Sequence, residues 1–254
     1  MNKFQLHEKA LKEIRKNKYN VAILPLGSTE PHNMHLPYGT DFYIADALAR
    51  KVCEIASKKG AKVIQLPPMP YAVNTNLLEF PMTISMQPST LDAVITDITK
   101  SLEKHGIYKL VILNGHGGNQ MRGFLRELYT KTKVFVTVLN WWDAGIKLEA
   151  GIFERPGEHA DEKETSMLLD IFPETVNMKN ADDGAVRRPK VKSFEEGWCF
   201  YVRPWKSYTK NTGYGDPRKS TRQKGQRYIS LVSEKIAKMV VELSKAKMAK
   251  GFPY

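Results

Sequence analysis

Carboxylates and imidazoles gather in one short segment near the N-terminus. Glu30, His32, His35 and Asp41 lie there, directly after the apolar run 21–26, which predicts a buried strand. Side chains two residues apart on an extended chain share a face, so Glu30 and His32 can hold one divalent ion together. We interpret His35 as a buried histidine outside the ligand set. Asp41 opens the next predicted helix, where it can be a metal ligand or a helix N-cap.

A glycine-rich turn holds a further histidine. The segment 114–119 reads Asn-Gly-His-Gly-Gly-Asn, follows another apolar run and places His116 between glycines. A strand-to-helix turn accounts for glycines with positive φ, but it does not account for an imidazole among them. Loops that bind ligands in open α/β sheets leave the carboxyl ends of the strands, so we expect His116 to lie near the first segment.

The third group of candidate ligands is the segment 158–166. Asp161 and Glu164 have the spacing of a capping box, with Asp161 as the cap. His159 then precedes the helix and can converge with Glu164, although residues five apart on one helix point roughly 140° apart. Without His35, the candidate ligands of the three segments are three His, two Glu and one Asp, which is more than one tetrahedral site needs. We therefore predict two divalent ions, Zn²⁺, Mn²⁺ or Fe²⁺, that share a bridging carboxylate.

Strands and helices alternate along the first half of the chain, with glycines at the ends of several helices. This order predicts an α/β fold, a three-layer α/β/α sandwich around a mostly parallel central sheet, in one domain spanning residues 1–254. Residues 173–218 are less regular, as in a lid or a subunit contact. The predicted strands are 21–26, 61–66, 109–113 and 134–140; the predicted helices are 7–18, 41–59, 90–105, one from the glycine-rich turn to about 131, and 219–250 with a break near Gly225.

Composition narrows the class of protein. The chain has 254 residues, 42% hydrophobic and 26% charged, without the long apolar run of a membrane helix or an apolar signal core. Its two cysteines make no disulfide framework, so we expect a cytoplasmic protein with neither a membrane nor a nucleic-acid partner. The net charge of +12 is spread over several helical faces and is compatible with an anionic small-molecule substrate.

Together these motifs resemble the creatininase (creatinine amidohydrolase) family. The resemblance rests on Gly-Ser-x-Glu-x-His-x-x-His-Leu-Pro at 27–37 with Asp41, on Asn-Gly-His-Gly-Gly-Asn at 114–119, and on His-Ala-x-x-x-Glu-Thr-Ser at 159–166. It implies an α/β/α sandwich, a two-metal hydrolase site and a homohexamer. It further implies that Asp41 bridges the ions, with Glu30, His32 and His116 as ligands and His159 as the proton-relay residue.

The chain departs from that family at several positions. Creatininase carries a carboxylate two residues after the equivalent of His116, where this chain has Gly118. Glu164 is our candidate to replace the missing ligand. Pro31, Asn33 and Met34 stand where the family usually has Gln, Gly and Pro, a change that leaves the candidate ligands intact.

The predicted activity is hydrolysis of a C–N amide bond in a small polar or cyclic substrate by metal-activated water. His159 would protonate the leaving nitrogen. Trp141 and Trp142 would line the pocket, unless one of them is a core residue, and Arg155 would bind an anionic group of the substrate. Two alternatives stay open. One is hydrolysis of a cyclic polyol ketone or lactone, and the other is a metal-binding or assembly protein without turnover.

Overall fold

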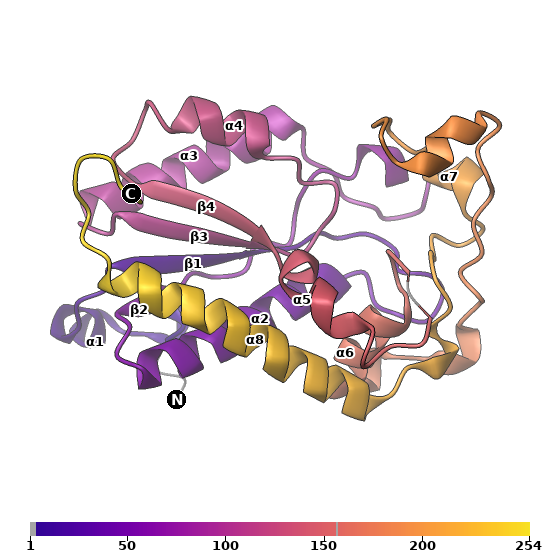
Figure 1. Ribbon diagram of the computed structural model, residues 1–254, viewed down its shortest axis with the longest axis horizontal. Coiled ribbons are helices and arrows are strands. Elements are labelled where there is room, and N and C mark those ends of the chain that lie inside the picture. The colour runs from indigo at the N-terminus through magenta and orange to yellow at the C-terminus, as the bar shows by residue number, and fades with distance from the viewer. Residues whose placement is uncertain (1–3, 156) are drawn as a thin grey trace.

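A parallel four-stranded sheet forms the centre of the protein (Figure 1). The computed structural model describes residues 4–155 and 157–254. The strands are β1 (Val21–Leu26), β2 (Val63–Gln65), β3 (Lys109–Asn114) and β4 (Phe135–Asn140), in the order β2-β1-β3-β4. Every pairing between them is parallel. The carboxyl ends of the strands therefore meet at one edge, as the alternation of strands and helices predicts.

Helices cover both faces of the sheet. α2 (Thr40–Lys58) and α8 (Arg222–Lys245) pack on the face that carries Val21 and Ile23, while α3 (Pro88–Lys104) and α4 (Arg122–Leu128) pack on the face that carries Ala22 and Leu24. Successive side chains of a strand point to opposite faces, so the fully apolar β1 contributes side chains to the hydrophobic core on each face of the sheet. The predicted three-layer α/β/α sandwich is confirmed, and Figure 1 shows the sheet between the two helical layers.

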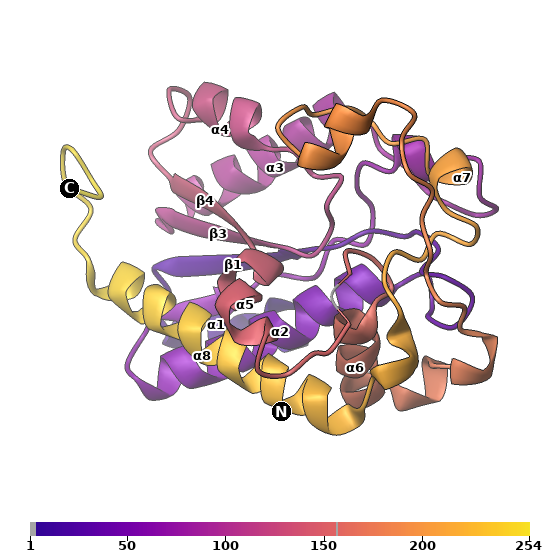
Figure 2. The same cartoon turned by 45° about the vertical axis from the view of Figure 1, so that its right-hand side comes forward.

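The remaining elements lie mostly beyond the carboxyl ends of the strands. α5 (Trp141–Glu149), α6 (Glu162–Ile171) and α7 (Trp205–Tyr208) gather there in both views (Figures 1 and 2). The predicted helix 7–18 is wrong in extent, because the chain forms only α1 (Leu11–Lys16) after a short 3₁₀ turn. The 3₁₀ helices are η1 (Leu6–Glu8), η2 (Thr75–Leu77), η3 (Pro173–Thr175), η4 (Met178–Asn180), η5 (Lys192–Glu196) and η6 (Pro217–Lys219).

Two helical glycines allow close packing between helices. The predicted break at Gly225 is wrong, since α8 is continuous there; a Cβ at Gly225 would collide with the carbonyl oxygen of Ser166 in α6. α5 is absent from the predicted elements and contains Gly145, whose missing Cβ makes room for the hydroxyl of Tyr228. Each glycine lets α8 approach another element more closely than alanine would allow.

No helix within residues 4–155 and 157–254 has the length and apolar character needed to cross a membrane.

Candidate metal centre

The carboxylate of Asp41 lies between two imidazoles from different loops. Its Oδ1 is 2.9 Å from Nε2 of His32, and its Oδ2 is 3.1 Å from Nδ1 of His116. Oε1 of Glu30 lies 2.9 Å from the same nitrogen of His116, and Oε2 of Glu164 lies 3.9 Å from Nε2 of His32. Two groups with metal-ligand geometry result, Glu30–Asp41–His116 and His32–Asp41–Glu164, and Asp41 belongs to both.

Backbone carbonyls fix which nitrogen of each imidazole faces this cluster. Nδ1 of His32 is 3.0 Å from the carbonyl oxygen of Glu30, and Nε2 of His116 is 3.0 Å from that of Val73. A carbonyl oxygen only accepts hydrogen bonds, so these nitrogens carry the protons. The other nitrogen of each ring then offers a lone pair to the cluster, which is the arrangement of a metal-binding histidine with a supporting hydrogen bond.

Buried carboxylates this close together are stable only if positive charge lies among them. Burial lowers the pKa of His32, but Asp41, Glu164 and Glu30 outweigh burial and raise this pKa to about 9. Burial likewise opposes protonation of His116, whose pKa is nonetheless raised well above its ordinary value by Glu30 and Asp41. Oε2 of Glu30 is buried without a hydrogen-bond partner. Protons or metal ions can supply the charge, and this mixed N/O donor set fits divalent ions of the Zn²⁺, Mn²⁺ or Fe²⁺ type.

Glu164 turns away from the usual capping-box contact. The side chain of Asp161 caps α6, since it accepts from the backbone N–H groups of Lys163 and Glu164. Oε2 of Glu164 instead accepts from the backbone N–H of Ala160 at 2.6 Å and faces His32. Burial raises the pKa of Glu164 to about 8. Ala160 has a φ of 50°, a left-handed conformation that is rare outside glycine and that directs its N–H to Glu164.

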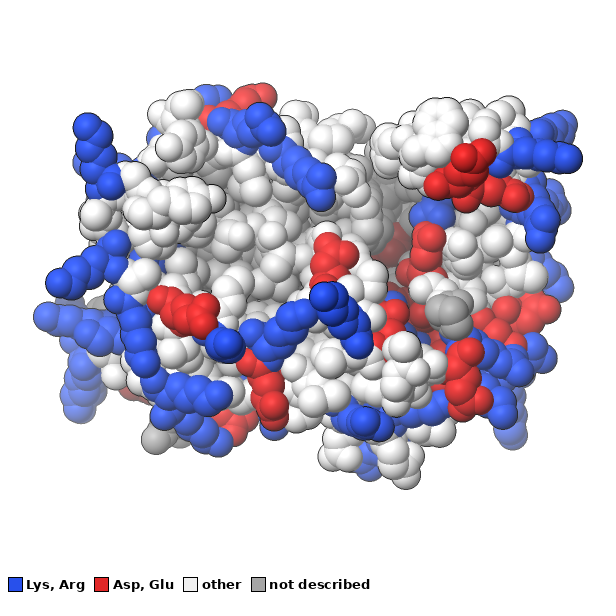
Figure 3. Space-filling model, viewed as in Figure 1, with Lys and Arg blue, Asp and Glu red and all other residues white. Residues whose placement is uncertain are grey.

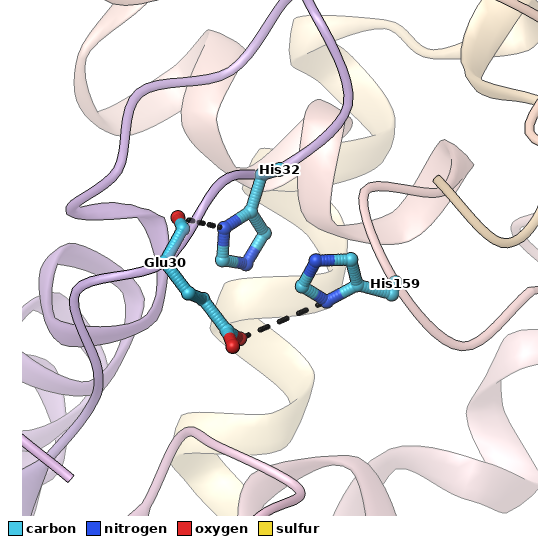
Figure 4. Close-up of side chains that lie close together, drawn as sticks. All are labelled: Glu30, His32 and His159. Atoms are coloured by element: carbon cyan, nitrogen blue, oxygen red, sulfur yellow. Dashed lines mark hydrogen bonds and ion pairs between the residues drawn. The ribbon is translucent and has the colours of Figure 1, made fainter. Parts of the chain in front are cut away.

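The imidazole of His159 lies beside Glu30 and His32 at the same cluster (Figure 4). Its ring centroid is 4.1 Å from that of His32, and its Nδ1 is 3.9 Å from Oε1 of Glu30. Nε2 of His159 donates to the carbonyl oxygen of Pro31 at 3.0 Å, so Nδ1 carries the lone pair on the side of Glu30. Burial, together with His32, lowers the pKa of His159 to about 3. A third metal-ligand grouping, Glu30–His32–His159, is also compatible with these distances.

A cavity of about 640 Å³ opens onto these residues, and Figure 3 shows acidic side chains in the hollow between α5 and the α7 region. Trp141 and Trp142 both line it, and Trp141 is also a core residue with 1% exposure. Arg155 does not line it, because its guanidinium pairs with Asp216 outside the cavity.

The structure brings other cavity residues together that no sequence pattern marked. Lys163 directly precedes Glu164, and this position in the third motif was the one available signal for it. Glu149 and Arg203 lie in segments without any recognisable pattern.

A parallel α/β sandwich with buried carboxylates and imidazoles at the carboxyl ends of its strands has the arrangement of a metallohydrolase. A family model described as "Creatininase: Creatinine amidohydrolase" matches residues 5–240. The chain therefore belongs to the creatininase family, and it is a metal-dependent hydrolase.

Relatives in this family carry different activities in their names. Creatinine amidohydrolase of Pseudomonas putida is 29% identical over 243 residues, which cover 87% of this chain and 89% of that protein. A mycofactocin precursor peptide peptidase of Mycobacterium ulcerans is 31% identical over 216 residues, with 81% and 78% covered. A 3-dehydro-scyllo-inosose hydrolase of Thermotoga maritima is 29% identical over 184 residues, with 68% and 58% covered.

Solved structures share the whole fold. A Bacteroides fragilis protein named for creatinine amidohydrolase superposes with a TM-score of 0.91 at 35% identity, covering 98% of this chain and 99% of that one. Creatininase structures in manganese and zinc–zinc forms have TM-scores of 0.76 and 0.77 at 24% identity, with 95% of this chain and 98% of theirs covered. At that identity the likeness concerns the fold.

Proposed function

We propose that this chain is a two-metal amidohydrolase that cleaves a C–N bond in a small polar or cyclic substrate. The observation that carries the proposal is the contact of the two oxygens of Asp41 with His32 and His116. Glu30, Asp41 and His116 would hold one divalent ion, and His32, Asp41 and Glu164 would hold the other. Bound there, such ions would supply Lewis acidity and lower the pKa of a bound water.

His159 would serve as the proton relay. Its low pKa keeps the imidazole neutral near pH 7, so its Nδ1 starts as a proton acceptor on the side of Glu30. It would take the proton of the attacking water and pass it to the leaving nitrogen. The Thr212 hydroxyl donates to the carbonyl oxygen of Pro31 at 2.9 Å, and this oxygen also receives the Nε2 proton of His159. Trp205 packs edge-on against His159, with 5.0 Å between the ring centroids, and so holds the imidazole and shields it from solvent.

The test has two parts, metal content and turnover. Elemental analysis of gently purified protein should give about two divalent ions per chain, by the logic of carboxylate-bridged sites. A panel of cyclic amides, N-formyl compounds and cyclic polyol ketones should then show hydrolysis of an amide. Ion content near zero after reloading with Zn²⁺, Mn²⁺ and Fe²⁺ would refute the two-metal site, and a metal-loaded protein without turnover would favour a binding or assembly role.

A second candidate activity is hydrolysis of a cyclic polyol ketone. The inosose hydrolase relative supports it. So do Glu149, Glu158 and Lys163, polar side chains that line the cavity and are not among the candidate metal ligands. The same ions would serve this reaction, but no leaving amine would need the proton of His159. Conversion of cyclic polyol ketones without any amide hydrolysis would select this activity.

We also propose a cytoplasmic homo-oligomer, a hexamer as in the family resemblance. Trp198, Phe200 and Val202 are among the most exposed large apolar side chains that the structure describes, and they follow one another along one segment. Such a cluster supports a subunit contact. Cys53 and Cys199 are unpaired, which supports a reducing compartment. Light scattering of the purified protein should give about six times the mass of one chain, and a monomer would refute this assembly.

A further inference from the structure

An ion pair between α5 and α6 faces the same cavity as the candidate metal ligands. Nζ of Lys163 donates to Oε1 of Glu149 at 3.0 Å, and both side chains line the cavity. The hydroxyl of Tyr228 donates to the same oxygen at 3.1 Å. Among the residues that the structure describes, Oε2 of Glu149 and two N–H groups of Lys163 have no protein partner. The pair thus keeps a free acceptor and free donors at the cavity.

The stability of α6 does not explain why a lysine occupies position 163. It lies in the first turn of α6, where the helix dipole disfavours a cation, and it is 8% exposed. A partly buried ion pair of this kind contributes little net stability, because desolvation offsets much of the attraction. Nζ of Lys163 lies 5.6 Å from the ring centroid of Trp141, whose buried Nε1 has no hydrogen-bond partner. The free N–H groups of Lys163 and the free oxygen of Glu149 can therefore bind a polar molecule that enters the cavity.

The charges of the cavity argue against an anion at this place. The cationic side chains that line it, within the described ranges, are Lys163 and Arg203. Lys163 pairs with Glu149, and Arg203 pairs with Glu158 at 2.7 Å. An anion bound to either cation would lie beside the carboxylate that already pairs with that cation, and the two negative charges would repel each other. A neutral hydroxyl group meets no such cost, because it can accept from Lys163 and donate to Glu149 at the same time.

We infer that Lys163 and Glu149 form a recognition subsite for a neutral, hydroxyl-rich part of the substrate, with Trp141 as its apolar side. The inference rests on the proposed hydrolase function and narrows its substrate to an uncharged polyol-type molecule in place of an anion. Lys163 and Glu149 determine specificity here and take no part in holding the metal ions.

Binding of three ring compounds by the metal-loaded protein tests this inference without turnover. The probes for titration calorimetry are myo-inositol, cyclohexanol and cyclohexanecarboxylate, which differ in hydroxyl content and charge. The variants are Lys163→Met, Glu149→Gln and the double variant, which removes both charges without leaving one buried and unpaired. Lys58→Met is the matched control, because Lys58 pairs with Glu54 on the exposed surface of α2.

We expect wild type and Lys58→Met to bind myo-inositol more tightly than the other two rings. Each single variant should weaken this binding by about tenfold or more, as for hydrogen bonds to charged groups, and the double variant should lose little further, because the two residues act as one unit. Metal content should stay at the wild-type value in every variant. Failure of the hydrolase proposal would appear differently, as wild-type protein without metal or without hydrolysis of any compound in the substrate panel.

Three results would overturn the inference. One is equal binding of myo-inositol by wild type and the double variant. Another is a wild-type preference for cyclohexanecarboxylate that Lys163→Met abolishes, which would mark an anion site. The third is the absence of myo-inositol binding by folded, metal-loaded wild type. If Lys163→Met does not fold because Glu149 is left unpaired, the neutral double variant decides the outcome.

Discussion

A Cβ at position 118 would collide with the imidazole of His116. Built on the backbone of Gly118, it would overlap Nε2 of His116 and the carbonyl oxygen of Val73 that accepts from this nitrogen. The position where the family resemblance places a carboxylate is therefore filled here by the ring of a candidate ligand. Glu164 reaches the same cluster from α6, where its Oε2 lies 3.9 Å from Nε2 of His32, and it remains our candidate for the missing ligand.

Gly118→Ala should displace His116 and lower the metal content. A methyl group there has no room, so the ring or the Val73 loop must move, and overpacking of this kind costs about 1–3 kcal/mol. Gly117→Ala is the matched control, because a Cβ at Gly117 meets no atom within 4 Å. Elemental analysis and chemical unfolding of both variants check the prediction. Full metal content in Gly118→Ala would contradict it.

Glu164→Gln should fold but lose about one ion per chain and most of the activity. The amide oxygen of glutamine can still accept from the N–H of Ala160, whereas its neutral head is a poor metal ligand. Asp161→Ala separates capping from metal binding, since loss of the cap should cost about 0.5–2 kcal/mol of stability with the ions retained. A Glu164→Gln protein with both ions and normal turnover would show that Glu164 is not a ligand.

His159→Gln should lower kcat by about 10²–10⁴-fold with the metal content unchanged. Its Nδ1 is 3.9 Å from the nearest carboxylate oxygen, Oε1 of Glu30, compared with 2.9 Å for His116. Measuring kcat, KM and ions on the same sample distinguishes a relay from a ligand. If an ion is lost together with activity, the grouping Glu30–His32–His159 is the one that binds metal.

Stability should fall between pH 7 and pH 5, in part because of His35. This residue is buried, its Nε2 is 2.8 Å from Oγ1 of Thr165, and burial lowers its pKa to about 4. In the unfolded chain His35 takes a proton near pH 6.5, whereas in the folded protein it stays neutral until about pH 4. The unfolded state then binds more protons, so stability decreases as the pH falls through this window, by about 2 kcal/mol between pH 7 and 5 for this one group.

His35→Gln isolates this contribution. The variant should lose less stability than wild type over the same pH range, as measured by chemical unfolding at pH 7 and pH 5. Identical pH dependence of the two proteins would show that His35 does not titrate as its burial indicates.

The layered fold could be predicted from the sequence because its signals are local. The apolar run of residues 21–26 predicts the strand, and hydrophobic periodicity together with Gly60 predicts the helix that follows. The break predicted at Gly225 is wrong, because a glycine that interrupts a helix and a glycine that allows close packing are identical in the sequence. Only the neighbouring carbonyl oxygen of Ser166 shows that Gly225 allows close packing.

The site could be predicted in part for the same reason. Asp41 was open between helix cap and ligand, and the structure has Gly39 at the N-cap position, which leaves the Asp41 carboxylate directed at two imidazoles. The sequence could not show which of Arg155 and Arg203 lines the cavity, because this depends on the carboxylate that each arginine pairs with. Asp216 holds the first outside the cavity, and Glu158 holds the second at its edge.

The hydrogen bond between Val73 and His116 has a thermodynamic consequence. Val73 lies between β2 and α3, outside every ligand-bearing segment, yet its N–H donates to Asn119 at 3.3 Å and its carbonyl orients the imidazole. If the loop position that orients His116 favours metal binding, metal binding must favour that loop position by the same coupling free energy, because such coupling is reciprocal. Substitutions in the loop can tune the affinity for metal without touching a ligand.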